Sequence, residues 1–289
     1  MIPAAFAYER PASLDEALGL LARNGDAKLL AGGQSLLPLL KLRLAGAERL
    51  IDIGRLRELR GIRELADGGL AIGALTTYRD LLDSPAAMRY RCLAEAVPGI
   101  ADVQVRNRGT IGGSIAHADP ASDIPAVVLA LGATLVARSS SGERTIPADA
   151  FFQGAFETAL RPGEILTEIR LPGASDSVGS AYRKLAQPAS GYSIVGVAAV
   201  VGRQGGGTGA ISMAQVGVTG VGDVAYRAAA VEAALVGSDG SASAIKAAAA
   251  HAADGQTVAS DIHADREYRA QMAGIYVRRA VEGALAALG

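Results

Sequence analysis

The sequence predicts an α+β protein, because two kinds of pattern follow each other along the chain. In the first part, short apolar runs that favour strands are interspersed with runs of helical periodicity. In the last part, strand patterns come first and alanine-rich helical patterns follow. A stretch rich in Ser, Gly and Asp, Gly173 to Gly179, lies between the two parts. We therefore expect one domain over residues 1–175, with subdomains at about 1–57 and 58–175, and a smaller C-terminal domain over 176–289.

Local signals support the elements expected in the first part. Ser13, followed by Glu16 three residues later, predicts an N-cap and a capping box for a helix over 14–23. Thr77 is expected to cap a helix over 78–82. The other helices expected here span 88–97 and 124–131, and the strands span 6–9, 28–30, 50–53, 70–73, 134–138, 144–146 and 164–171.

The last part is expected to contain three antiparallel strands followed by helices. Alternating apolar residues predict the strands, and runs of alanine predict the helices. Within the last helix, Tyr268, Met272 and Ile275 recur at helical spacing, so we expect them in the core. The expected strands span 180–184, 194–202 and 210–219, and the expected helices span 225–236, 242–253 and 264–288.

The composition excludes several classes of function. With 28 basic and 29 acidic residues the net charge is −1, which creates no overall field that favours a nucleic acid or an anionic membrane. The longest apolar run, 124–137, is too short to span a bilayer and contains Pro125 and Gly132. The first residues lack the basic and then apolar order of a signal peptide. We therefore expect a soluble cytoplasmic protein with no integral membrane segment and no nucleic-acid partner.

A single cysteine, Cys92, restricts the redox chemistry that this chain can hold. One thiol cannot form an internal disulfide, bind an iron–sulfur cluster or complete a cysteine zinc site. Any redox cofactor on this chain must therefore be organic. The histidines, His117, His251 and His263, are scattered, and no third ligand lies at a suitable spacing from His117 and Asp119. We expect no metal site.

Two glycine pairs near the N-terminus have the same construction. They are Ala31-Gly32-Gly33-Gln34-Ser35 and Thr110-Ile111-Gly112-Gly113-Ser114. A Gly-Gly step allows a positive φ and lets a ligand approach the main chain closely. A serine just after it can cap a helix or bind an oxyanion. The repeated turn predicts a ligand with two phosphates, bound on both sides by main-chain amides.

A third glycine cluster does not predict a nucleotide site. Gly205 to Ala210 matches the pattern G-x-G-x-x-A of dinucleotide-binding units, but that pattern requires a helix after the turn. Ile211 to Val216 alternates like a strand instead, so we expect a hairpin here. No serine lies in a G-x-S-x-G motif, and the chain has no P-loop.

The glycine turns belong to an ordered set of segments that extends along the whole chain. The set comprises Ala31–Pro38, Gln104–Ser114, Asp119–Pro125, Gly163–Leu166, Tyr182–Lys184 and Ser190–Tyr192. It resembles the FAD subunit of molybdenum hydroxylases, the xanthine dehydrogenase and aerobic carbon monoxide dehydrogenase family. The length is most similar to that of the medium subunit of the carbon monoxide dehydrogenase type.

The resemblance implies a fold and a set of cofactor contacts. The fold would be an FAD-binding domain of the vanillyl-alcohol oxidase (PCMH) type, followed by a smaller flavoprotein domain. Asp123 would hydrogen-bond the sugar or ribityl region of FAD. Tyr192 would lie against the flavin ring, although it can also be read as a tyrosine on a sheet surface. The pyrophosphate would lie against Ala31, Gly32, Gly33, Gln34, Ser35, Thr110, Ile111, Gly112, Gly113 and Ser114. The other residues expected to bind the cofactor are Leu36, Ile100, Leu166 and Lys184.

The chain departs from the family pattern at three places. Gln34 stands where the family often has His, and Ser114 where it often has Asn. Both are polar and short enough to bind a phosphate oxygen. The loop Gln187 to Gly191 differs from its charged equivalent in other branches, which leaves the electron acceptor and the subfamily open.

The resemblance also implies a function without a catalytic residue on this chain. The chain would carry FAD, receive electrons from a small subunit with [2Fe–2S] clusters, and pass them to quinone, NAD or another acceptor. A large subunit would hold the molybdenum cofactor, in a dimer of heterotrimers. Two alternatives stay open: a stand-alone FAD oxidoreductase of the vanillyl-alcohol oxidase type, and a binding or assembly protein that keeps the fold without cofactor.

The glycine turns lead to a first prediction. Gly33→Val or Gly112→Val should abolish the retention of FAD, because a branched Cβ would block the backbone angle and the approach of a phosphate. The flavin absorption of the purified variants measures this. Full flavin occupancy with an unchanged spectrum in either variant would show that the turn in question is assigned wrongly.

Overall fold

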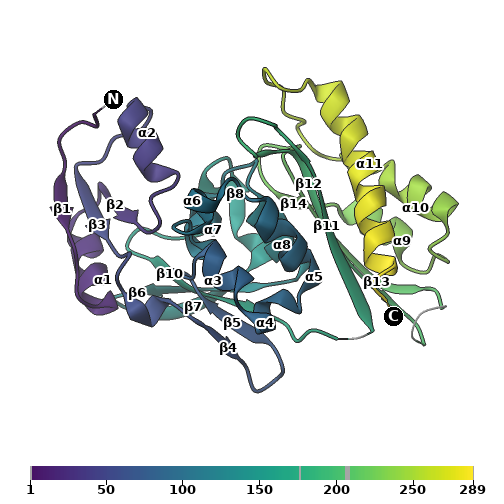
Figure 1. The fold of residues 1–289 in the computed structure, drawn as a ribbon, viewed down its shortest axis with the longest axis horizontal. Coiled ribbons are helices and arrows are strands. Elements are labelled where there is room, and N and C mark those ends of the chain that lie inside the picture. Colours follow the sequence, from purple (N-terminus) through teal and green to yellow (C-terminus); the bar gives the residue numbers. More distant parts are fainter. Residues whose placement is uncertain (1, 176, 206–208, 289) are drawn as a thin grey trace.

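In the part of the chain that the structure describes, the fold consists of three sheets of three, five and four strands in series, with a short two-stranded hairpin beside the middle one (Figure 1). A computed structural model describes residues 2–175, 177–205 and 209–288. The first sheet has the order β1-β3-β2, and both pairs are parallel. Its elements are β1 (Ala7–Glu9), α1 (Leu14–Arg23), β2 (Ala27–Leu30), α2 (Leu36–Leu42) and β3 (Arg49–Asp52).

The predicted start of α1 is confirmed. The Ser13 hydroxyl accepts a hydrogen bond from the amide of Glu16 at 3.2 Å, as an N-cap does. The Glu16 carboxylate accepts its bond from the amide of Ala12 at 2.7 Å. The N-terminus of the helix is therefore capped by two reciprocal bonds. The second goes to the amide of Ala12, one residue before the Ser13 amide that a standard capping box uses.

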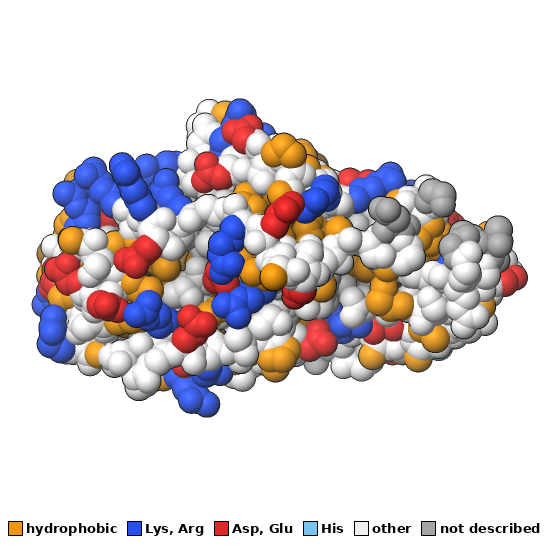
Figure 2. Space-filling model, turned by 90° about the horizontal axis from the view of Figure 1, so that it is seen from below, with side chains coloured by type: hydrophobic (Ala, Val, Ile, Leu, Met, Phe, Trp, Pro, Cys, Tyr) orange, Lys and Arg blue, Asp and Glu red, His pale blue; other side chains and the backbone are white. Residues whose placement is uncertain are grey.

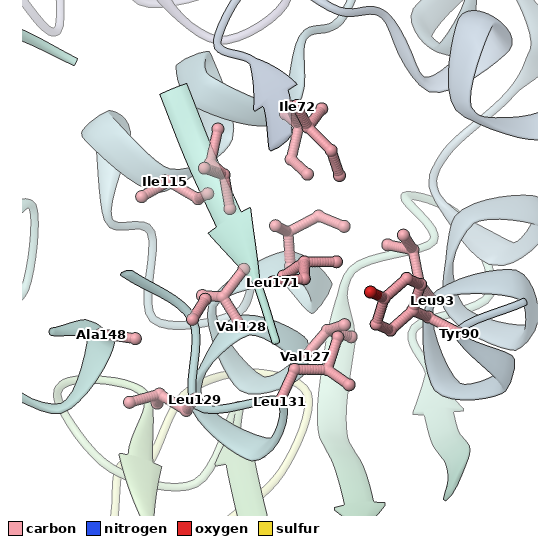
Figure 3. Packing of buried hydrophobic residues seen from close by; sticks show 14 of the residues in the cluster. Ile72, Tyr90, Leu93, Ile115, Val127, Val128, Leu129, Leu131, Ala148 and Leu171 are labelled. Carbon is pink, nitrogen blue, oxygen red and sulfur yellow. The ribbon is translucent and has the colours of Figure 1, made fainter. Parts of the chain in front are cut away.

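The middle sheet is antiparallel, with the order β4-β5-β10-β6-β7. Helix α7 packs on β10 and α4 on β4, and apolar residues of α3, α5, α7 and α8 form one core with the sheet (Figure 3). Its strands are β4 (Ile62–Glu64), β5 (Leu70–Gly73), β6 (Thr134–Ser139), β7 (Gly142–Pro147) and β10 (Ile165–Leu171), with the hairpin β8 (Phe152–Gly154) and β9 (Glu157–Thr158) beside them. The helices are α3 (Tyr78–Leu82), α4 (Pro85–Met88), α5 (Arg91–Ala96), α6 (Val103–Arg106), α7 (Ile111–His117) and α8 (Asp123–Ala130), with short 3₁₀ turns at Arg57–Leu59, Val97–Gly99 and Ala148–Ala150.

The single helix expected over 88–97 is wrong. The chain forms α4, then α5, then a 3₁₀ turn, because Tyr90 interrupts the helical path with an extended backbone (ψ 91°). Tyr90 is buried, and its hydroxyl donates to the carbonyl of Pro172 at 2.7 Å. Burial of this side chain and its hydrogen bond to the far end of β10 therefore decide where the helix breaks.

The last sheet, of order β11-β12-β13-β14, is antiparallel and lies between two layers of helices (Figure 1). Helix α11 covers one face, whereas α8 and α5 of the preceding part pack on the other. The elements are β11 (Val178–Ala186), β12 (Ser193–Arg203), β13 (Ile211–Thr219), β14 (Tyr226–Arg227), α9 (Ala229–Leu235), α10 (Ala242–Ala249) and α11 (Arg266–Leu285).

Strand β12 shows why this sheet joins the two parts of the chain. Val195 and Val197 point into the core beneath α9 to α11, whereas Ala198 and Val200 belong to the core shared with the middle sheet. Both faces of the strand are thus buried, which accounts for its almost continuous apolar sequence. The α+β class and the smaller C-terminal domain are confirmed.

Two expectations for the last part need correction. The sheet has a fourth strand, β14, so the helix expected from residue 225 begins only at Ala229. In α11, Tyr268 is 42% exposed and Met272 is partly buried against the core, whereas the buried face is formed by Arg269, Ala273, Val277, Ala280, Val281 and Ala284. The small side chains of this face let the helix lie close to the sheet, and Arg269 is accommodated because its guanidinium donates to the carbonyls of Ile194 and Gly220.

The glycine cluster after β12 is followed by a strand, as expected. Gly205 has a φ of +68°, and Ile211 begins β13, which pairs antiparallel with β12. Gly206, Gly207 and Thr208 lie outside the described residues. Since the described residues after the cluster form the strand β13 and not a helix, the cluster lacks the context of a dinucleotide-binding turn.

Surface charge is mixed in sign. Figure 2 shows basic and acidic side chains interspersed over much of one face, with a group of Lys and Arg at the end formed by the N-terminal sheet. In the part of the chain that the structure describes, no helix is long and apolar enough to cross a bilayer.

Close packing between α8 and β13 leads to a stability prediction. A Cβ on Gly217 would lie within 2.9 Å of the carbonyl carbon of Ala126 and closer still to its oxygen. Gly217→Ala should therefore push α8 away and lower the free energy of unfolding by about 1–3 kcal/mol. Gly46→Ala is the control, because Gly46 is exposed and a Cβ there meets nothing within 4 Å. Urea denaturation of both variants tests this, and equal stabilities would contradict it.

Candidate cofactor site

A cleft of about 1350 Å³ lies where the three sheets approach each other. Its walls come from α1 and β2, from both glycine turns, from the hairpin tip Ser139 to Ser141, and from the loop Pro188 to Tyr192 of the last part. Ligand sites of drug size have volumes of about 300–1,000 Å³. This cleft can therefore hold a longer molecule that spans all three parts.

The first glycine turn presents a row of free amides to the cleft. Among the described residues, the main-chain N–H groups of the five residues Gly32 to Leu36 donate to no protein acceptor. Gly33 has a φ of +74°, a conformation that favours glycine. A Cβ on Gly32 would collide with the carbonyl oxygen of Arg108. The turn is thus a concave strip of N–H donors, which is the chemistry of an anion-binding nest.

The second glycine turn uses its amides inside the protein. Ile111 and Gly112 donate to the carbonyls of Thr76 and Ala74 at 3.0 and 2.9 Å. Gly113 donates to the Thr110 hydroxyl at 3.1 Å, and Ser114 to the Thr110 carbonyl at the same distance. These bonds anchor the turn to the end of β5. Within the described residues, the amides of Ile111 to Ser114 thus already have acceptors inside the protein, unlike those of the first turn.

Gly112 is needed for a reason other than the expected one. It lies in α7, and its φ is not positive. A Cβ there would lie 2.6 Å from the Ala74 carbonyl oxygen. A larger residue would therefore separate α7 from β5 instead of blocking a phosphate.

Asp123 is a buried carboxylate at the edge of the cleft. It is the first residue of α8 and is only 5% exposed. The hydroxyls of Tyr182 and Ser193 donate to its Oδ1, the latter at 2.9 Å. The Lys184 ammonium lies 2.9 Å from Oδ1 and 3.0 Å from Oδ2. The negative charge of Asp123, which lies in the middle part, is thus compensated by the Lys184 ammonium of β11 and hydrogen-bonded by hydroxyls of β11 and β12.

Tyr192 lies in a loop that closes on itself at the cleft. Its carbonyl accepts from the amide of Gln187 at 2.8 Å, and Gly191 allows the turn with a φ of +73°. The ring is 42% exposed and lines the cleft. Burial raises the pKa of the phenol, and the nearby Asp119 charge raises it further. The side chain is therefore a neutral aromatic at pH 7, open to the cleft on one side.

Several cleft residues lie outside the set that the sequence predicts to bind a cofactor. His117 at the end of α7 packs against Phe156, with ring centroids 5.1 Å apart, and burial lowers its pKa. Tyr78 lines the cleft beside the second turn, and burial raises its pKa. His117 follows the second glycine turn by one helical turn, a proximity that could have drawn attention to it. No local signal marks Tyr78, because only the fold brings it to the cleft.

All but two of the residues predicted to bind cofactor line this cleft. Ile111 is 1% exposed in the core of the middle part, and Lys184 lies behind Asp123. The residues that do line it are Ala31, Gly32, Gly33, Gln34, Ser35, Leu36, Ile100, Thr110, Gly112, Gly113, Ser114, Asp123, Leu166 and Tyr192.

Known protein families match both parts of the chain. Residues 4–174 match the family described as the FAD binding domain in molybdopterin dehydrogenase. The chain belongs to this family. Residues 180–284 match the CO dehydrogenase flavoprotein C-terminal domain.

Individual relatives in this family are similar over nearly their whole length. The carbon monoxide dehydrogenase medium chain of Hydrogenophaga pseudoflava is 45% identical, with 99% of each chain covered. The 6-hydroxypseudooxynicotine dehydrogenase complex subunit alpha of Paenarthrobacter nicotinovorans is 39% identical over 99% of this chain and 96% of that subunit.

Solved structures agree with these relatives. A chain of the carbon monoxide dehydrogenase from H. pseudoflava, in a form that lacks the Mo-pyranopterin moiety of its cofactor, superposes with a TM-score of 0.95 and 46% identity over the whole of both chains. A chain of quinoline 2-oxidoreductase from Pseudomonas putida 86 gives 0.91 and 34%, again over both whole chains. The chain is therefore the FAD-binding subunit of an oxidoreductase similar to carbon monoxide dehydrogenase.

The cleft fits FAD, the cofactor of this family. The row of free amides at Gly32 to Leu36 suits a pyrophosphate, and the length of the cleft suits an extended dinucleotide. Tyr192 supplies an aromatic surface, and Ile100 and Leu166 supply apolar ones. Within the described residues, no group of His, Cys, Asp and Glu could hold a metal ion.

The ion pair of Asp123 and Lys184 leads to a second stability prediction. Their side chains are 6% and 10% exposed, so removing one partner leaves a buried charge without compensation. Lys184→Met should lower the free energy of unfolding by about 3–5 kcal/mol, and the double variant Lys184→Met/Asp123→Asn should recover much of that loss.

An exposed ion pair supplies the control. Arg79 and Asp83 are 58% and 57% exposed, so Arg79→Met should cost no more than about 1 kcal/mol. Chemical denaturation measures all three variants. If the Lys184→Met variant were as stable as the Arg79→Met variant, the Lys184 ammonium would not be needed to compensate the buried charge of Asp123.

Proposed function

We propose that this chain is the electron-transferring FAD subunit of a heteromeric molybdenum hydroxylase. It would stand between a small subunit with [2Fe–2S] clusters and an external acceptor such as a quinone or NAD. The observation that carries this proposal is the cleft wall at Gly32 to Leu36, where five successive main-chain amides donate to no acceptor among the described residues. Bound FAD supplies the redox chemistry, which none of the side chains in the cleft can supply.

In this proposal the two glycine turns have different tasks. The amides of Gly32 to Leu36 hold pyrophosphate oxygens, with Gln34 and Ser35 adding side-chain donors. The second turn supports them, because the carbonyl of Arg108, just before it, lies where a Cβ on Gly32 would be. Ser114 shares a hydrogen bond of 2.7 Å with Ser122, which fixes its hydroxyl in the cleft wall.

The remaining cleft residues would orient the rest of the cofactor. Asp123 would accept a hydrogen bond from the sugar or ribityl region. Tyr192 would lie against the flavin ring and limit the access of water to one of its sides. Ile100 and Leu166 would supply apolar contacts, and Lys184 would act on the cofactor only through Asp123, since it does not line the cleft.

Partner subunits would hold the other redox centres. Cys92 is fully buried, and burial raises the pKa of its thiol to about 12, so it is no ligand for an iron–sulfur cluster. The relatives are described as medium chains or as subunits of complexes, and their named substrates differ widely. We infer that the large subunit selects the substrate, in a cytoplasmic dimer of heterotrimers. The domain boundary would lie between residues 175 and 176, with both domains forming the cleft.

Isolation of the complex and a matched pair of glycine variants test the proposal. The chain should co-elute with iron- and molybdenum-containing subunits and show flavin absorption. A yellow, active monomer would contradict the assignment to a complex, and a protein that takes up no FAD would contradict it altogether.

Gly33→Ala should reduce the FAD content, because a positive φ costs an L-residue about 1–2 kcal/mol and the new Cβ would lie 2.9 Å from Leu37. Gly46→Ala should bind FAD like the unaltered chain. Equal FAD content in the two variants would show that the first turn does not hold the cofactor.

A further inference from the structure

Two hydroxyls of the C-terminal part converge on the carboxylate of Asp123. Tyr182 comes from β11 and Ser193 from the start of β12, and both are at least 96% buried. Each donates to Oδ1, and the two hydroxyls lie 3.4 Å apart. Neither residue lines the cleft. They therefore reach the cleft only through Asp123.

The hydrogen bonds leave the two carboxylate oxygens unequal. A carboxylate has about four acceptor positions, two on each oxygen. The hydroxyls of Tyr182 and Ser193 fill the two positions on Oδ1. The Lys184 ammonium contacts both oxygens, and it is the one donor that Oδ2 receives among the described residues. Within the described residues, one acceptor position on Oδ2 thus stays open for a donor in the cleft.

The surrounding backbone holds the same arrangement. The amide of Ser193 donates to the carbonyl of Ala121 at 3.1 Å, and the Thr219 hydroxyl donates to the carbonyl of Pro120 at 2.6 Å. The Lys184 ammonium also donates to the carbonyl of Gly99 at 2.9 Å. The loop before α8 is therefore fixed by the strands that carry the hydroxyls. Burial raises the pKa of Tyr182 well above its usual value, so its hydroxyl keeps its proton and stays a donor.

We propose that Tyr182 and Ser193 are positioning residues for FAD. They hold Oδ1 of Asp123 so that Oδ2 is presented to a hydroxyl or N–H donor of the cofactor. This inference rests on the proposed function, since it takes FAD to be the ligand of the cleft. The C-terminal part would then contribute to cofactor affinity through these two buried hydroxyls as well as through the loop Pro188 to Tyr192 in the cleft wall.

Removal of one hydroxyl tests the proposal. Tyr182→Phe keeps the ring and its packing but frees Oδ1 to turn toward the remaining donors. The dissociation constant of FAD for the flavin-free full chain should rise about fivefold, the cost of one hydrogen bond. Ser193→Ala should have an effect of similar size. Titration of the full chain with FAD, followed by the change in flavin fluorescence, gives both constants.

Two other buried tyrosines serve as matched controls. Tyr226 is 8% exposed and donates to the carbonyl of Ala252 at 2.8 Å, and Tyr90 is 4% exposed and donates to Pro172. Neither hydroxyl contacts Asp123. Tyr226→Phe and Tyr90→Phe should lower the melting temperature about as much as Tyr182→Phe but leave the FAD constant unchanged.

The outcomes separate the inference from the function on which it rests. An unaltered chain that binds no FAD contradicts the proposed function. An unaltered chain that binds FAD, together with a Tyr182→Phe variant of equal affinity, contradicts the positioning role alone. Equal losses of affinity in Tyr182→Phe and Tyr226→Phe also contradict it, because they would show that any buried hydroxyl stabilises the fold and with it the cleft.

Discussion

The burial of one carboxylate constrains how the two parts of this chain meet. Asp123 begins α8, a helix buried along its whole length between the middle sheet and β13. An isolated charge at such a position would cost several kcal/mol, so it must be paired and hydrogen-bonded. The partners come from β11 and β12, which fixes the register of the last sheet against the middle part. The shape of the cleft follows from that register, because Ser193 is adjacent to Tyr192.

The two glycine turns show how similar sequences acquire different tasks. The first turn is followed by α2, whose N-cap Ser35 makes no capping bond with its side chain, and its amides stay free. The second turn lies just past the end of β5, and the amides of Ile111 to Ser114 are satisfied by the carbonyls of Ala74 and Thr76 and by Thr110. The first turn can therefore bind an anion, whereas the second turn packs against the first and supports it. Neighbouring backbone decides the difference.

Elements with strong local signals were predictable, and those that depend on distant contacts were not. Thr77 caps α3 as expected, with Asp80 completing the capping box, and the hairpin of β6 and β7 forms at Ser141-Gly142. The break at Tyr90 was missed because its cause is the carbonyl of Pro172, far away along the chain. The buried face of α11 was only partly predictable, because besides small residues it holds Arg269, whose partners are the distant carbonyls of Ile194 and Gly220.

The sequence by itself determined the class of the fold, the family and most of the cleft residues. Turn chemistry, capping and hydrophobic periodicity act between near neighbours, so a single chain displays them directly. Tertiary structure alone decided which amides stay free at Gly32 to Leu36, why Gly112 must be small, and that Lys184 lies behind Asp123. These features depend on which distant groups already satisfy a donor or fill a space. Residue types cannot reveal that before the chain has folded.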